Sequence, residues 1–333
     1  MPPPVRRSVL VVFVTCASAL LVAGAALAGN GGLAPPAPAS PNAQSIRDMY
    51  WLILGVTGGI FILVMTTLIL FVVRYRSRGR PREVEGPQVR GHNNLELAWT
   101  AGPVIILAVI AAFVFWKVSD INGTSQAAES APAREQITID GHQYYWEFIY
   151  PNGAISVDHL RLPYNRVVRL RIVSHDVDHS WWVPALGGKL DAIPGKTNFM
   201  SFRATKLGTF PGQCAEFCGL LHAQMLAKAE VMPADDYASW IEERANSPLA
   251  LGKETFVGVC AKCHGLAGTG DVGPDISQSP LFADRKGITS VIRNGIGTMP
   301  AVGQGWTQAQ LDATIAYLRL RFAQGGGGGG GQG

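Results

Sequence analysis

The sequence has little charge, since Asp, Glu, Lys and Arg make up only 16% of its 333 residues. Soluble domains carry about a quarter charged residues, so this composition excludes a typical cytosolic protein. The net charge is +4, and the basic excess lies in one short stretch, 74–92, where six arginines face only Glu83 and Glu85. Because nucleic-acid-binding proteins spread basic residues over a domain, this distribution excludes that class.

Cysteine is also scarce, and the number of cysteines is odd. Five cysteines exclude a scaffold held together entirely by paired disulfides, so each cysteine needs its own explanation. Disorder is excluded as well, because 47% of the residues are apolar and many of them lie in long runs. The length allows roughly two domains.

The N-terminus has the pattern of a secretory signal peptide over residues 1–28. Two arginines at positions 6 and 7 precede an apolar run from Val9 to Leu27, and Ala26-Leu27-Ala28 fits a cleavage site. The run is also long enough for an additional transmembrane helix, which is the alternative interpretation. Cys16 lies inside the run and would be removed with the signal peptide.

Two further apolar runs predict a transmembrane hairpin over residues 48–118, after a flexible N-terminal segment at 29–47. The spans cover about 50–73 and 97–118, each long enough to cross a hydrocarbon core of about 30 Å. The arginine-rich stretch between them should face the cytoplasm by the positive-inside rule. Everything after Lys117 would then lie outside the cytoplasm, in agreement with an exported N-terminus.

Short strand-like runs separated by turn residues follow over residues 134–232 and predict an all-β sandwich. The expected strands are Ile137–Ile139, Tyr144–Tyr150, Val167–Val173, Asn198–Phe202 and Met225–Val231. A linker at 233–250, helical over 235–246, leads to a small all-α domain at 251–324 whose last helix is expected at 307–320. The Gly-rich tail at 325–333 should be disordered.

Soft metal ligands gather in one turn-rich stretch of the predicted sandwich. A blue-copper site uses one Cys, two His and a weak axial Met, and Cys218, His222, Met225 and upstream His179 supply that set. Cys214 is a second thiolate, and two thiolates can bridge two coppers, each capped by one imidazole. A Cys214–Cys218 disulfide, a structural zinc site and a copper-delivery protein are the alternatives. We favour binuclear copper because the softness and the number of ligands both agree with it.

A second cluster, Cys260-Ala261-Lys262-Cys263-His264, has the C-x-x-C-H pattern of covalent haem attachment. Cys260 and Cys263 would form thioethers with the haem, and His264 would be the proximal iron ligand. Met299 is the candidate distal ligand, because Met/His ligation raises the reduction potential and suits an electron carrier. A zinc knuckle would need a second ligand pair and a redox disulfide would need a βαβ setting, so both alternatives are disfavoured.

With these motifs the chain resembles subunit II of the haem-copper cytochrome c oxidases, in the caa-type branch with a fused class I cytochrome c. The resemblance rests on segments in the family's order: Glu96–Thr100, Gly141–Trp146, His179–Trp181, Asp191–Gly195 and Gly212–Met225. It implies a cupredoxin-like Greek-key sandwich with a CuA centre. The implied ligands are His179, Cys214, Cys218, His222, Met225 and the backbone carbonyl of Glu216. The Glu216 carboxylate would also help to bind a magnesium ion at the junction with subunit I.

Three weaker signals concern single residues. Tyr144 stands where the family often has a tryptophan that accepts electrons from a soluble cytochrome c, so we expect the fused haem domain to replace that donor. Glu96 is a candidate for the mouth of a proton pathway in subunit I, with a solvated end residue as the alternative. Asp176 and Asp178 flank His179 and could orient its imidazole, although a solvated loop is the favoured interpretation.

The sequence therefore predicts the subunit through which electrons enter a terminal oxidase. Electrons would pass from a cytochrome c donor to the haem at His264, to the two coppers and to haem a of subunit I. That subunit would reduce oxygen to water and translocate protons, so this chain would hold no catalytic residue itself, and subunit III would be a further partner. The location would be the bacterial plasma membrane, with both metal domains on the periplasmic face. A stand-alone, membrane-anchored electron-transfer protein that serves another reductase is the alternative.

Overall fold

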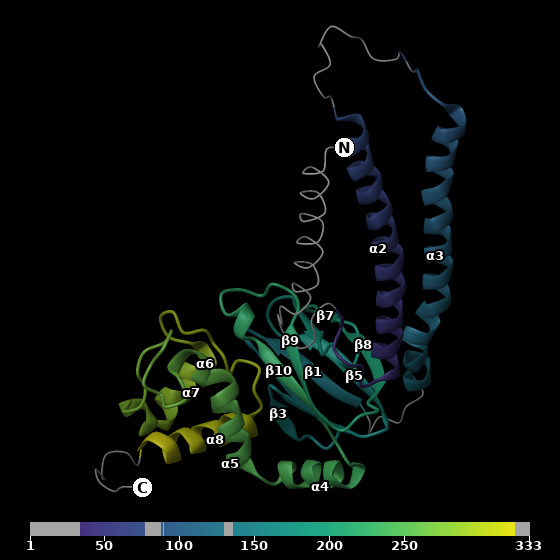
Figure 1. The fold of residues 1–333 in the computed structure, drawn as a ribbon. Coiled ribbons are helices and arrows are strands. Elements are labelled where there is room, and N and C mark those ends of the chain that lie inside the picture. Colours follow the sequence, from purple (N-terminus) through teal and green to yellow (C-terminus); the bar gives the residue numbers. More distant parts are fainter. Residues whose placement is uncertain (1–33, 77–87, 89, 130–135, 324–333) are drawn as a thin grey trace, which may run out of the picture. The chain divides into compact units, whose positions relative to one another are not determined.

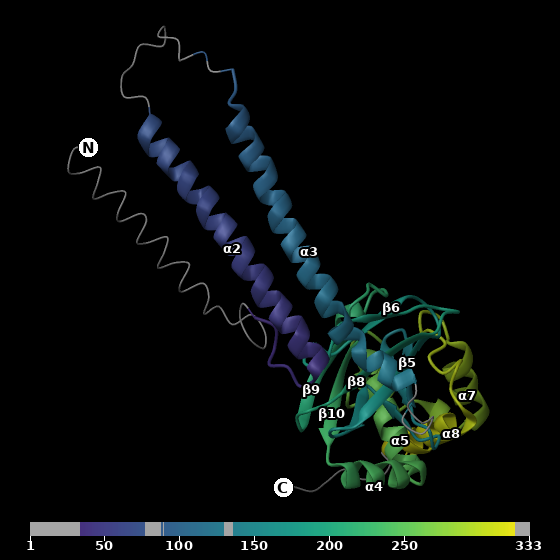
Figure 2. The same ribbon diagram turned by 90° about the vertical axis from the view of Figure 1, so that its right-hand side faces the viewer.

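The computed structural model describes residues 34–76, 88, 90–129 and 136–323 of the chain (Figures 1 and 2). They fall into two compact units, one with two long helices and one with a β-sandwich and a helical domain. The predicted signal peptide (1–28), most of the predicted cytoplasmic loop and the Gly-rich tail (325–333) lie outside the described residues.

The first unit contains helices α2 (Pro41–Tyr75) and α3 (Asn93–Glu129), which run in opposite directions (Figure 1). Pro41–Tyr75 and Asn93–Val118 are long and apolar enough to cross a membrane. Large apolar side chains along both helices, such as Leu63 and Phe115, are exposed, as expected of surfaces that face lipid. Beyond the predicted span, α3 continues to Glu129, and the sequence has no proline in this stretch before Pro132.

The end of the predicted flexible segment 29–47 is ordered. Residues Pro36–Ala43 belong to the unit that contains the sandwich. The Ala39 amide donates to the Ala185 carbonyl over 2.7 Å, and the Ser40 hydroxyl donates to the Leu186 carbonyl over 2.6 Å. Both small side chains are buried. The prediction of flexibility is wrong here because small residues also permit close backbone approach, which composition alone does not reveal.

Two five-stranded sheets form the predicted all-β sandwich, with strand orders β3-β2-β1-β5-β8 and β4-β10-β9-β6-β7. The strands are β1 (Gln136–His142), β2 (Tyr145–Ile149), β3 (Ile155–Val157), β4 (His159–Pro163), β5 (Val167–Ser174), β6 (His179–Trp182), β7 (Leu190–Ala192), β8 (Asn198–Arg203), β9 (Gly208–Cys214) and β10 (Leu226–Met232). Trp146, Phe148 and Trp181 meet edge to face in the core, with ring centroids 5.2 and 5.4 Å apart.

All five expected strands are confirmed, at β1, β2, β5, β8 and β10. The other five strands were not predicted. Strands β3 and β7 have only three residues each, β6 has four, and β9 contains Gly and Pro. Such strands show too few alternations, or too many turn residues, to register as a period-2 pattern.

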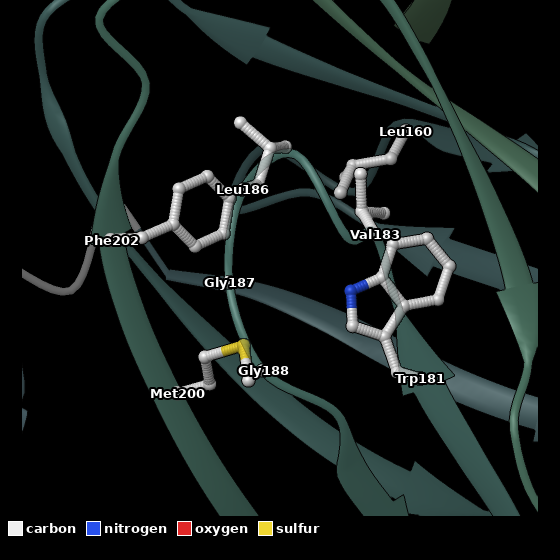
Figure 3. A pocket seen from close by; sticks show the side chains of 8 residues that line it. All are labelled: Leu160, Trp181, Val183, Leu186, Gly187, Gly188, Met200 and Phe202. Carbon is white, nitrogen blue, oxygen red and sulfur yellow. The ribbon is translucent and has the colours of Figure 1, made fainter. Parts of the chain in front are cut away.

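A small pocket opens in the sandwich beside Trp181 (Figure 3). Met200 and Phe202 face Trp181 across it, and Gly187 and Gly188 pass behind. None of the residues that line this pocket is charged. Its apolar lining identifies it as a gap in the packing rather than a site for chemistry.

The helical domain follows the sandwich. Its elements are α4 (Ala234–Ala245), α5 (Pro248–Thr255), the π-helical turn η3 (Phe256–Cys260), α6 (Ala261–His264), η4 (Pro280–Phe282), α7 (Arg285–Asn294), α8 (Gln308–Leu318) and the π-helical turn η5 (Arg319–Ala323). The expected terminal helix is confirmed as α8, whose first turn is capped by the Thr307 hydroxyl. Buried side chains of Leu311, Ile315 and Leu318 on α8 pack with Phe256.

The sandwich and the helical domain share part of their core. Tyr145 of β2 and Val157 of β3 are buried in the same cluster as Phe256, Trp306 and Leu311 of the helical domain. In addition, Trp240 of α4 packs against Tyr150 with ring centroids 4.9 Å apart. The predicted linker 233–250 is thus a helix seated on the sandwich, and the two domains form one packed body.

Helices α5 and α8 approach each other closely at Gly252, which allows a prediction about stability. A methyl group on buried Gly252 of α5 would overlap the Ala313 carbonyl oxygen of α8 and lie 2.9 Å from Cβ of Tyr317. We expect Gly252→Ala to destabilise this pair by ~1–3 kcal/mol through overpacking, despite the higher helix propensity of alanine. Hydrogen exchange of α5 and α8 amides measures the change. Lys253→Ala, at the exposed neighbouring position, is the control, and equal protection in both variants would contradict the prediction.

Candidate metal centre

The strand pairing of the second sheet brings the predicted metal ligands to one end of the sandwich. His179 opens β6 and Cys214 closes β9, and the two strands pair in antiparallel fashion with Trp181 opposite Cys214. The chain then turns through η2 (His222–Gln224) and reaches Met225, directly before β10. The backbone amide of Cys214 donates to the Met225 carbonyl over 2.9 Å and closes this loop, 214–225, which is called the metal loop below.

Five predicted ligand side chains are buried or partly buried in one group, in which two imidazoles and a thioether surround the two thiols. Sγ of Cys214 lies 3.9 Å from Nδ1 of His179, and Sγ of Cys218 lies 3.5 Å from Nδ1 of His222. Sδ of Met225 lies 3.7 Å from Sγ of Cys218. The donor atoms of His179, Cys214 and Cys218 all lie within 4.8 Å of one another. Each thiol therefore has its own imidazole, and both are close enough to share metal ions.

The backbone of the metal loop adds one more donor. The Glu216 carbonyl oxygen lies 3.2 Å from Sγ of Cys214, where the resemblance expects a ligand. Gly219 has φ +127°, and a Cβ there would lie 2.6 Å from the hydroxyl oxygen of Tyr144. Only glycine fits this turn, so Tyr144 can approach the loop closely.

A carboxylate orients the first imidazole. Asp176 Oδ1 lies 2.8 Å from Nε2 of His179, which leaves Nδ1 directed at Cys214. Asp176 therefore orients the imidazole, as its position next to His179 allows, while both Asp176 and Asp178 lie exposed in the loop, as expected. Position alone could not separate the two, because both acids flank the same histidine. Carboxylates in this place fix the orientation and tautomer of metal-binding imidazoles.

The two thiols differ in acidity. Burial raises the pKa of Cys218 to about 12, and the neighbouring Cys214 adds to the effect. Burial also opposes ionisation of Cys214, but the hydrogen bond and positive charge of His179, together with backbone hydrogen bonds at Glu216 and Ser180, outweigh it and lower the pKa of Cys214. For His179, hydrogen bonds to Asp176 and Cys214 outweigh burial and raise the pKa to about 9. Because metal ligands bind in the deprotonated form, the Cys214 thiolate is ready for a metal ion, and the His179 imidazolium releases its Nδ1 proton to solvent when the metal binds.

The donor set fits copper better than the alternatives. Two thiols, two imidazoles and a thioether are soft ligands, which copper selects, whereas structural zinc sites do not use methionine. Cys214 and Cys218 are free cysteines in this structure. A disulfide between Cys214 and Cys218, one of the alternatives, would remove both thiols and leave the nearby imidazoles and thioether without a common role.

The second cluster lines a cavity of about 270 Å³ that opens between the two domains of the larger unit, close to the lower end of the usual range for cofactor sites. Cys260, Cys263, His264 and Met299 all lie on its wall. Nδ1 of His264 lies 2.7 Å from the Pro274 carbonyl oxygen, so Nε2 is the nitrogen available to a metal. These residues fit a haem that is attached through the two thiols.

The opposite wall of this cavity comes from the sandwich. It is formed by Gln143 and Tyr144, in the turn directly before β2, and by Leu220 and Leu221 of the metal loop. Lys262, inside the C-x-x-C-H motif, also lines the cavity. Sequence patterns contain no signal for this juxtaposition, because residues 143–144, 220–221 and 260–264 are far apart in the chain.

Glu96, the candidate for the mouth of a proton pathway, belongs to the unit that contains the two long helices. It lies in the first turn of α3, where its carboxylate accepts a hydrogen bond from the His92 amide over 3.1 Å. An acid at this position satisfies a free amide and interacts favourably with the helix dipole.

Comparison with known proteins agrees with this arrangement. Residues 28–116 match the family described as "Cytochrome C oxidase subunit II, transmembrane domain", and residues 153–232 match "Cytochrome C oxidase subunit II, periplasmic domain". Residues 247–318 match "Cytochrome C oxidase, cbb3-type, subunit III".

Individual relatives carry the same name. "Cytochrome c oxidase subunit 2" of Alkalihalophilus pseudofirmus is 33% identical over 323 residues, which cover 87% of this chain and 91% of that protein. The protein of the same name from Bacillus sp. (strain PS3) is 30% identical, with 66% of this chain and 67% of that protein covered. The solved periplasmic domain of subunit II of cytochrome oxidase (CoxB) of Bradyrhizobium japonicum shares 33% identity over 35% of this chain and 96% of that chain, with a TM-score of 0.33. The chain thus belongs to the cytochrome c oxidase subunit II family and carries a cytochrome c domain fused at its C-terminal end.

Proposed function

We propose that this chain takes electrons from a cytochrome c donor at a covalently bound haem c and passes them through a binuclear CuA centre to haem a of subunit I. The family supports the broader role, since the relatives are subunits of a terminal oxidase. The observation that carries the finer route is the shared cavity, which has haem-attachment residues on one wall and the metal loop on the other.

In this proposal Cys214 and Cys218 would hold the two coppers through their thiolates. His179 and His222 would each supply an imidazole, while Met225 and the Glu216 carbonyl would complete the ligand set. The paired thiol–imidazole distances of 3.9 and 3.5 Å support this division. When bound, the two coppers share one electron, which limits the geometric change on reduction. The chain's own contribution is to hold the donor atoms in place and to keep them buried.

The haem would be held by thioethers to Cys260 and Cys263, with His264 and Met299 as axial ligands. The Pro274 carbonyl fixes the ring orientation of His264. Met299 lies in a tight turn, where its amide donates to the Ile296 carbonyl over 2.9 Å. A ligand on such a braced turn keeps its position as the iron changes oxidation state.

The proposed partners are oxidase subunits I and III in the bacterial plasma membrane, with both metal domains on the periplasmic face. Phe217 of the metal loop is 77% exposed, and a large apolar side chain of this kind suits burial against another subunit. The exposed Glu216 carboxylate is the proposed magnesium ligand at that junction, and Glu96 the proposed mouth of the proton pathway. Purification of the solubilised protein without a large haem-copper partner would support the stand-alone electron carrier instead.

The bridging role of Cys214 can be tested by metal analysis. We expect Cys214→Ser to lower the copper content from two ions per chain to one or none, because a hydroxyl is a poor ligand for a soft metal. Gln224→Ala changes an exposed residue of the same loop and should leave two coppers in place. Two coppers in the Cys214→Ser protein would contradict the bridging assignment.

The axial role of Met299 can be read from the haem spectrum. We expect Met299→Ala to abolish the low-spin Met/His spectrum and to lower the reduction potential, with covalent haem retained. Ile296→Ala, at an exposed position of the same turn, is the control. An unchanged spectrum in the Met299→Ala protein would exclude this residue as the ligand.

The order of electron transfer can be tested on the unmodified protein by rapid mixing with reduced donor. We expect the haem absorption to change first and the copper signal to follow, at a rate for the second step that does not depend on donor concentration. Direct reduction of copper ahead of the haem would contradict the proposed route.

A further inference from the structure

The haem-attachment motif carries one side chain that haem attachment does not explain. Lys262 lies between the two cysteines, yet its side chain is only 16% exposed. Its Nζ donates to Asp158 Oδ2 over 2.5 Å and to the Tyr144 carbonyl over 2.7 Å. Both partners belong to the sandwich. A lysine placed only for solubility would keep its ammonium group in water.

Asp158 is built to receive this lysine. Its side chain is 18% exposed, and its other oxygen accepts a hydrogen bond from the Trp146 amide over 2.8 Å. The residue has φ +55°, a conformation that costs energy for residues other than glycine and persists where the surroundings demand it. Burial raises the pKa of Asp158 to about 6, although the Lys262 charge opposes the shift. A carboxylate kept in such a site needs a cationic partner.

The Tyr144 carbonyl connects this ion pair to the metal loop. The Tyr144 hydroxyl accepts a hydrogen bond from the Leu220 amide over 3.0 Å. Next to it, the Gln143 side-chain amide donates to the carbonyl of Cys218 over 2.6 Å. One short segment, 143–144, is therefore bonded to the haem-attachment motif on one side and to the predicted copper ligand Cys218 on the other.

A second set of contacts also joins the helical domain to the sandwich, but these contacts lie away from Lys262. Glu254 of α5 pairs with Arg161 and Arg244, and Arg244 donates to the Ile155 carbonyl over 2.8 Å. Glu147 accepts a hydrogen bond from the Gln310 side chain over 2.6 Å. These contacts fix α5 and α8, but none of them reaches the segment that carries the cysteines. Within the motif 260–264, it is the Lys262 side chain that donates hydrogen bonds to the sandwich.

We infer that Lys262 and Asp158 are positioning residues that clamp the haem-attachment segment against the metal loop and set the haem-to-copper geometry. The inference rests on the proposed function for its electron-transfer consequence, but the clamp itself is a property of this chain's residues. Removal of either partner leaves the other charge largely buried without compensation, which is strongly unfavourable. The helical domain would then stay attached through the shared core, while its haem-bearing end moves away from Tyr144.

Two substitutions test the clamp in the full, metal-loaded chain. Lys262→Met keeps the apolar stem without the charge, and Asp158→Asn keeps the shape without the charge. We expect each substitution to increase the rate of amide exchange in β2 and α6 by about 10- to 100-fold. We also expect each to slow electron transfer from haem to copper by about tenfold or more. Copper content and the haem spectrum should not change. Lys262→Arg, which retains the charge, should restore much of both properties.

The matched control is Asp312→Asn. It removes the Arg285–Asp312 ion pair, which lies on the exposed surface of the same domain with side chains 56% and 42% exposed. We expect almost no effect, since exposed pairs contribute little. The double variant Lys262→Met/Asp158→Asn should be no worse than either single variant, because the pair acts as a unit.

The outcomes separate the two proposals. The clamp is wrong if Lys262→Met has no more effect than Asp312→Asn on the amide-exchange rate and on the rate of haem-to-copper transfer. It is also wrong if the effects of Lys262→Met and Asp158→Asn on amide exchange add up in the double variant. If the unmodified protein shows no haem-to-copper transfer, the proposed route is wrong. Amide exchange in the two single variants and the double variant then tests the clamp by itself.

Discussion

The pairing of β6 with β9 is the constraint on which the metal loop depends. It places Trp181 opposite Cys214 and so brings His179 to a loop that already holds the other ligand candidates. The Ala215 amide donates to the Ser180 carbonyl over 2.9 Å and extends the same ladder past the cysteine. Because these are backbone bonds at the end of a packed sheet, the ligand atoms are held near their working positions before a metal binds. Sites on such rigid elements lose little order on metal binding.

The segment 143–146 extends this rigidity to the second domain. Trp146 packs in the sandwich core beside His179, with ring centroids 5.8 Å apart. Tyr145 is buried with the helical domain, and its hydroxyl accepts a hydrogen bond from the Trp306 indole over 2.8 Å. Neighbouring residues of one strand thus belong to two different cores. A displacement of the helical domain would disturb the strand that braces the metal loop, so the two domains cannot be treated as independent bodies joined by a linker.

The sequence was sufficient for the order of the domains and for the candidate ligands, because each has a local signature. Apolar runs predict the helices α2 and α3, and the C-x-x-C-H motif and the Cys214–Met225 stretch identify their chemistry through spacing alone. The remaining features depend on contacts between distant residues. Asp176 and Asp178 look alike in sequence, and only the fold directs Asp176 to His179. Likewise, Pro36–Ala43 has the composition of a flexible segment, and its role in the sandwich unit follows from backbone bonds that composition does not encode.

In the proposed route the donor is fused to the copper domain, which would change the forces that set the rate of electron transfer. A soluble donor must find the copper domain by diffusion, and the exposed charges that guide it are screened by salt. Here the contacts between the domains are largely buried, including the apolar cluster around Tyr145 and Val157 and the ion pair of Lys262 with Asp158. Buried contacts are screened far less, and tethering makes the encounter intramolecular. Tyr144, where the family often has tryptophan, fits this setting. Its hydroxyl accepts a hydrogen bond from the Leu220 amide, and its ring does not need to serve as a docking surface for a soluble donor. In the proposed route, recognition of the external donor would shift away from the metal loop to the outer surface of the helical domain, where salt and donor concentration still act.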